Sequence, residues 1–170
     1  MKILAVLLTM LLSGSALASK PYSVKSFMLL QPDSVLQERV GDVQGLANYV
    51  KSLDAAAAAA LSRAKKPTPA AGFIVVAVRP NGQSKVWLDL SPALPPAVAT
   101  QLRTSLERVP PFKARDGVVV FAINTTLWGS APTERQNPWP AEWKKAMKGA
   151  KGAVEVGDLV DRVWPSKSGT

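Results

Sequence analysis

Residues 73–90 read FIVVAVRPNGQSKVWLDL, and this stretch decides the fold. The run Phe73–Val78 is apolar at every position, which predicts a central strand covered on both faces. Asn81-Gly82 then separates it from the alternating run Lys85–Leu90, and Asn-Gly between two such runs is the strongest short signal of a β-hairpin. The stretch therefore predicts two antiparallel strands joined by a tight turn.

A long helix is predicted before this hairpin, over residues 42–64. Asp42 is a suitable N-cap, and Ala55–Ala60 is a run of the residue with the highest helix propensity. Leu53 and Leu61 flank the run at helical spacing. We therefore interpret the alanine run as a closely packed face rather than as low-complexity filler.

A second helix is predicted over residues 96–108, and a third strand follows over residues 117–127. The order helix, strand, strand, helix, strand predicts an α+β fold with a small three-stranded antiparallel sheet. A right-handed crossover through the second helix returns the third strand beside the first, which gives the spatial order two-one-three. The most apolar strand then lies in the middle.

The chain is expected to divide into a lead-in, a core and an extension. Residues 19–41 show no sustained period and are expected to be an extended lead-in, although Val24–Leu30 is also compatible with a short strand. Residues 42–128 form the predicted core domain. Residues 129–170 form a Trp-rich C-terminal extension, which is expected to cover the second face of the central strand and to pack over Trp87.

The first eighteen residues have the pattern of a signal peptide. Lys2 is followed by the apolar run Ile3–Leu12, and Ala16-Leu17-Ala18 is a small-x-small cleavage pattern. Cleavage is expected before Ser19. The sequence therefore predicts export to the periplasm.

The chain contains no Cys and no His. The missing residues exclude a Ser-His-Asp triad, a His-bound zinc ion and a thiol nucleophile, and leave carboxylate, lysine or serine-lysine chemistry. The acidic residues show no paired motif. We therefore predict no catalytic residue, no metal site and no cofactor.

The chain is basic. Lys and Arg number 21 and Asp and Glu 12, so the formal net charge is +9; without the signal peptide, whose one charged residue is Lys2, it is 20 minus 12, or +8. Such a charge suits an acidic protein partner, an anionic membrane surface or a cell-wall polymer, or serves solubility alone. Because the bases are scattered, no nucleic-acid partner is expected.

Four segments carry a resemblance to a known family. They are GFIVVAVRPNG at 72–82, the run Val86–Ser91, VPPFK at 109–113 and DGVVV at 116–120. In this order they resemble the TonB C-terminal domain family over about residues 70–128. That family's energy transducers keep a membrane anchor and a long Pro-rich spacer, whereas a cleavable signal is predicted here. The resemblance implies a stand-alone envelope module, and in that family an exposed sheet edge binds a partner strand.

Two surfaces are candidate binding sites. The first is the predicted edge strand near residues 120–126, where a partner peptide would pair with the backbone; the alternative is an ordinary edge kept soluble by polar residues. The second is a basic, aromatic stretch that would contact an anionic surface; the alternative is that Trp139 and Trp143 pack on the sheet. The candidate residues are Val120, Ala122, Asn124, Thr125 and Thr126 for the edge, and Trp143, Lys144, Lys145, Lys148 and Lys151 for the basic stretch.

Three functions are compatible with these features. The leading hypothesis is a non-enzymatic periplasmic module that binds an envelope protein through its sheet edge. The second is a periplasmic inhibitor or immunity protein that blocks a toxin or a hydrolase. The third is a carboxylate-dependent cell-wall hydrolase, which would need two acids facing one cleft. The sequence predicts neither the partner's identity nor the oligomeric state.

Overall fold

The computed structural model describes residues 20–65, 67–150 and 152–165, so the predicted signal peptide lies outside the described residues. Within these ranges, no helix is long and apolar enough to cross a membrane. In chain order the elements are β1 (Tyr22–Leu29), α1 (Asp33–Arg39), α2 (Val43–Ser62), β2 (Ala70–Val78), β3 (Ser84–Ser91), α3 (Pro96–Glu107), β4 (Val119–Leu127), α4 (Ala141–Ala146) and α5 (Val156–Val163).

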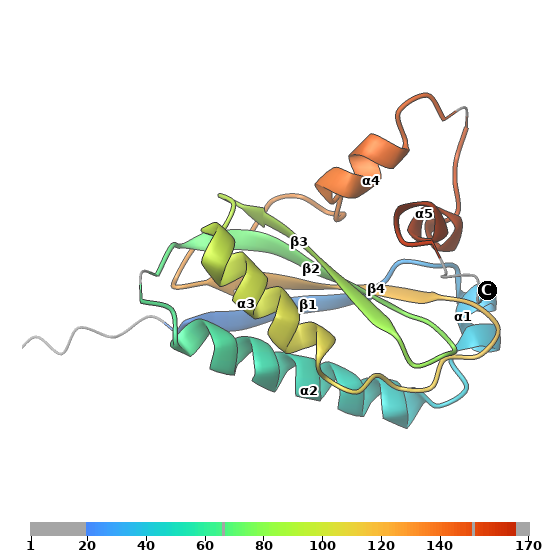
Figure 1. The fold of residues 1–170 in the computed structure, drawn as a ribbon, viewed down its shortest axis with the longest axis horizontal. Coiled ribbons are helices and arrows are strands. Elements are labelled where there is room, and N and C mark those ends of the chain that lie inside the picture. Colours follow the sequence, from blue (N-terminus) through green and yellow to red (C-terminus); the bar gives the residue numbers. More distant parts are fainter. Residues whose placement is uncertain (1–19, 66, 151, 166–170) are drawn as a thin grey trace, which may run out of the picture.

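The strands form one antiparallel sheet in the order β1-β4-β2-β3 (Figure 1). The α+β class and the antiparallel sheet were predicted, but the prediction of three strands was wrong, because β1 adds a fourth strand beside β4. The β2–β3 hairpin closes at Gly82, whose φ of +75° lies in the left-handed region that favours glycine. There the Arg79 N–H donates to the Gln83 carbonyl at 2.9 Å.

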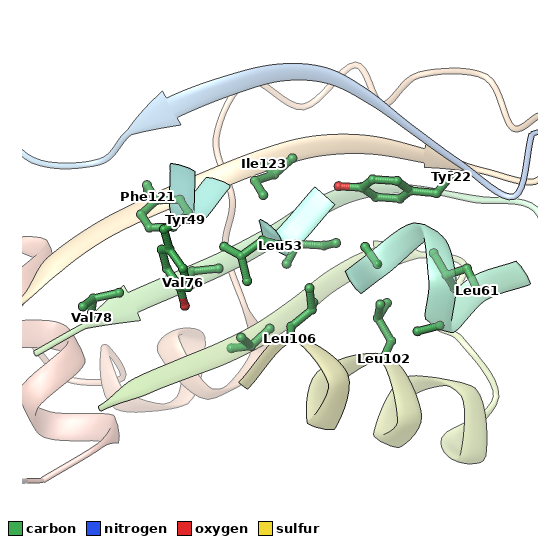
Figure 2. Packing of buried hydrophobic residues seen from close by; sticks show 14 of the residues in the cluster. Tyr22, Tyr49, Leu53, Leu61, Val76, Val78, Leu102, Leu106, Phe121 and Ile123 are labelled. Carbon is green, nitrogen blue, oxygen red and sulfur yellow. The ribbon is translucent and has the colours of Figure 1, made fainter. Parts of the chain in front are cut away.

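Helices α2 and α3 cover one face of the sheet, which we call the helix face (Figure 1). The Asp42 carboxylate accepts a hydrogen bond from the Gly45 N–H at 2.8 Å, so this residue caps α2 as the sequence predicts. Figure 2 shows Leu53 of α2 and Leu106 of α3 pointing toward Val76 on β2. All three are buried, so this face holds the larger core of the protein.

The C-terminal extension covers the opposite face, which we call the tail face (Figure 1). Two ion pairs tie the extension to the sheet: Arg79 to Asp161 at 2.8 Å, and Arg135 to Asp89 at 2.7 Å. The buried side chains between the layers include Phe73, Val75, Trp87, Trp143, Leu159 and Val160. Every strand residue of β2 is consequently buried, in agreement with its uniformly apolar sequence.

The lead-in is part of the core rather than an extended segment. Residues 22–29 form β1, and residues 33–39 form α1, a helix that the sequence analysis did not predict. Leu36 of α1 is buried in the helix-face core. The Arg39 guanidinium donates to the Val118 carbonyl at 2.9 Å. The core unit therefore begins well before residue 42.

Candidate functional site

The predicted binding edge is not an edge of the sheet. Strand β4 pairs with β1 on one side and with β2 on the other, so both of its backbone rows are occupied. The five residues predicted to contact a partner lie inside this strand. Val120, Ala122 and Thr125 are fully buried, Thr126 is nearly so, and Asn124 is partly buried. The placement of the edge at β4 was therefore wrong.

Strand β1 is an edge of the sheet, and a β-bulge explains why its strand pattern was hard to recognise. Tyr22 and Val24 alternate toward the helix face, but the register shifts between Val24 and Ser26, which leaves Lys25 as an extra residue. The next residues on the helix face are Phe27 and Leu29. The extra residue changes the alternation from even to odd positions, so the sequence shows no continuous period of two.

The outer backbone groups of β1 point away from the sheet. The Leu30 N–H donates to the Val120 carbonyl at 3.0 Å, and the Trp128 N–H donates to the Pro21 carbonyl at 3.3 Å. Successive residues of an antiparallel strand alternate between bonding to their neighbour and facing outward. Counting from both ends to the bulge, the N–H and C=O groups of Tyr22, Val24, Phe27 and Leu29 face outward.

Apolar side chains accompany these outward backbone groups. Val24, Phe27 and Leu29 keep 43%, 39% and 41% of their surface exposed. The Phe27 ring packs against Phe121 with a centroid separation of 5.3 Å, so it is anchored on the core while its outer side meets solvent. We call these three side chains the β1 row. An exposed apolar row along a free strand edge is a feature that soluble proteins usually avoid.

A groove continues the β1 row at the end of the strand. It has a volume of about 370 Å³ and lies between the end of β1, α1 and the start of α2. Its apolar walls come from Leu29, Leu36, Val40, Val43 and Leu46. Val43 is 73% exposed, the largest value among the exposed large apolar side chains of the described chain. The edge therefore offers both a backbone ladder and an apolar recess next to it.

Buried hydrogen bonds hold the end of β1 in place. Gln31, 6% exposed, accepts from the Val120 N–H and donates to the Glu155 carboxylate, each at 2.9 Å. Burial raises the pKa of Glu155, but hydrogen bonds from Gln31 and from the N–H groups of Gly157 and Asp158 outweigh burial and lower it below the usual value. The Gln31 side chain thus continues the β1–β4 hydrogen bonding by one residue beyond Leu30.

The opposite edge of the sheet, β3, is partly occupied by a side chain. The outward N–H of Val86 donates to the Glu107 carboxylate at 3.0 Å. The described residues therefore leave β1 as the more open of the two edges.

In the predicted basic binding stretch, the aromatic residue Trp143 is buried rather than exposed. Trp143 is only 2% exposed and stacks edge-on against Trp87 at 5.7 Å, so it cannot contact an external surface. The neighbouring Trp139 is 42% exposed instead. Lys144, Lys145 and Lys148 are exposed, and Lys151 lies outside the described residues.

The described residues assemble no paired acidic site in the cavity next to the β2–β3 turn. This cavity, of about 760 Å³, lies between the β2–β3 turn, the end of α3 and Trp164, and Glu107 is its one carboxylate. Glu107 already accepts the Val86 N–H and lies 3.8 Å from the Lys85 ammonium. Among the described residues, no group of three or more acidic side chains could hold a metal ion.

The chain was compared with protein-family models, curated proteins and solved structures. No family model matches it. No curated protein and no solved structure matches it either. The assignment of function therefore depends on the geometry described above.

Proposed function

We propose that this chain is an exported, non-enzymatic periplasmic module that binds an envelope protein along the edge strand β1. The observation that carries the proposal is the coincidence of outward backbone groups with the β1 row on one edge strand, whose outer side pairs with no other strand of the described chain. A partner in extended conformation would add a fifth strand, because main-chain hydrogen bonds supply affinity and side-chain pockets supply specificity in this mode of recognition.

The exposed area of the β1 row indicates how much its burial would contribute to the free energy of binding. Burying a Val, Leu or Phe side chain completely is worth about 1.5–3 kcal/mol. About two-fifths of each of the three side chains is still exposed. Covering the row would therefore contribute about 2–4 kcal/mol before the cost of ordering the partner. This contribution alone gives weak binding, so the backbone ladder and the groove must add to it.

The resemblance to the TonB C-terminal domain family supports the proposal in one respect, since that family also binds a partner strand at a sheet edge. In the proposed module the edge is β1, which lies outside the segment of resemblance at residues 70–128. The predicted signal peptide supports a partner in the periplasm.

Photo-crosslinking in living cells tests the proposal. A benzoylphenylalanine probe replaces Phe27, and matched chains carry it at Thr125, which is buried, or at Lys148, which is exposed on the tail face. The proposal predicts one dominant protein adduct from position 27 and none from positions 125 and 148. Mass spectrometry then identifies the partner, and a toxin or hydrolase would identify the chain as an inhibitor. Adducts from position 148 alone would contradict the assignment to β1.

A further inference from the structure

The middle of β1 carries a positive charge that no described residue neutralises. Lys25 is the extra residue of the bulge, and its side chain is exposed. It forms no ion pair with any residue in the described parts of the chain. Lys20, just before the strand, is also exposed and unpaired among the described residues. The β1 row thus surrounds an unbalanced charge.

A second copy of this chain is the simplest strand that could occupy the edge. An antiparallel pair of β1 strands that matches apolar with apolar places Val24 opposite Phe27 and Tyr22 opposite Leu29. In this register the two-fold axis passes between residues 25 and 26, so the Lys25 side chains of the two copies become neighbours. Like charges at such positions destabilise strand pairing. Lysine and bulges on edge strands are also known devices against edge-to-edge association.

The same arrangement favours a strand of opposite charge. We propose that the β1 edge selects an extended partner segment that carries Asp or Glu opposite the bulge, next to Lys25, and apolar side chains opposite Val24, Phe27 and Leu29. The inference rests on the proposed function, because it specifies the partner of that edge. The net charge without the predicted signal peptide, 20 minus 12 or +8, supports an acidic partner in general, and Lys25 fixes where the acid lies.

At the groove, next to the end of β1, a negative charge on the partner is disfavoured. Asp33 lines the groove beside Leu29, together with the uncharged Gln37. An acidic partner residue at this end would face a carboxylate. The acceptable partner pattern is therefore one acid near the centre, apolar residues on either side of it, and a neutral apolar residue at the groove.

Two matched seven-residue peptides test the inference. Both carry valine at positions 1, 3, 5 and 7, opposite Leu29, Phe27, Val24 and Tyr22 in the antiparallel register, because a regular partner strand has no separate residue for the extra residue Lys25. One peptide has Glu at position 4, opposite the bulge and next to Lys25, and the other has Lys there. A cross-strand pair of opposite charges strengthens pairing by up to about 5-fold, and a like-charge pair weakens it by a similar factor. We expect the Glu peptide to bind at least about 3-fold tighter by fluorescence anisotropy, and the difference to shrink in 1 M salt, where charges are screened within about 3 Å.

Charge reversal provides the decisive control. The variant Lys25→Glu should reverse the peptide preference, whereas Lys148→Glu on the tail face changes the net charge equally and should leave the preference intact. Circular dichroism checks that both variants are folded. Equal binding of both peptides would overturn the charge inference while leaving edge binding in place. Binding of neither peptide would overturn both, and identify Lys25 as edge protection only.

Sedimentation velocity tests whether a second copy of this chain occupies the β1 edge. The wild-type chain is expected to be a monomer, because self-pairing brings the two Lys25 side chains together. A stable wild-type dimer that excludes the Glu peptide would make a second copy the occupant of β1 and would overturn the inference.

Discussion

Replacing Trp143 by alanine tests how the C-terminal extension is held on the sheet. Trp143 is 2% exposed, and its ring packs edge-on against Trp87 at 5.7 Å. Large-to-small substitution of a fully buried aromatic side chain costs about 3–5 kcal/mol, because the transfer free energy is lost and a cavity remains. The aromatic pair adds about 0.5–1.5 kcal/mol beyond the buried area, which favours the upper part of this range.

Trp139→Ala is the matched control, since it changes the same residue type four positions earlier. Trp139 is 42% exposed, so solvent can fill the space that the substitution creates. We expect the free energy of unfolding to fall by about 1–2 kcal/mol, because only the buried part of the Trp139 side chain loses its transfer free energy and no cavity remains. Urea unfolding followed by far-ultraviolet circular dichroism measures both variants. Equal losses for the two variants would refute the conclusion that Trp143 anchors the extension.

Two further predictions concern buried polar groups. Arg79→Met should lower the free energy of unfolding by about 1–3 kcal/mol, because the 5%-exposed guanidinium loses its bonds to Asp161 and to the Trp164 carbonyl. Asp161→Asn should lower it by less than about 1 kcal/mol, because the Asp161 side chain is 60% exposed. Urea titrations compare the two variants, and a larger loss of stability for Asp161→Asn than for Arg79→Met would contradict the prediction. Burial raises the pKa of Tyr22 above its ordinary value of 10.0, so its contribution to stability is complete below pH 10 and is lost as the pH rises further. Tyr22→Phe should therefore make stability fall less steeply above pH 10 in thermal melts, and an unchanged slope would argue against a buried hydroxyl.

Much of the fold could be predicted because its signals are local. The uniformly apolar run Phe73–Val78, the Asn81-Gly82 turn and the N-cap Asp42 each specify an element through neighbouring residues. These signals correctly predicted α2, the hairpin and α3 within a few residues. They also predicted that β2 is central, because only a strand covered on both faces needs no polar position.

The candidate site was misplaced because its deciding feature is non-local. The polar residues Asn124, Thr125 and Thr126 suggested a solvent-exposed edge, but pairing with β1 buries two of them. The bulge at Lys25 hid that partner strand by changing the alternation between Val24 and Phe27. A search for period-two patterns that permits one inserted residue would have detected β1. The pairing itself depends on residues about a hundred positions apart, which local patterns do not specify.

Amide hydrogen exchange on β1 with the Glu peptide bound tests the central claim most directly. The amides of Phe27 and Leu29 face outward, whereas those of Ser26 and Met28 face β4, as the ladder from Leu30 implies. Strand addition predicts that exchange slows at Phe27 and Leu29 on binding and changes little at Ser26 and Met28, because those two amides are already hydrogen-bonded. Unchanged exchange at Phe27 and Leu29, or equal slowing at all four amides, would contradict binding along the β1 edge.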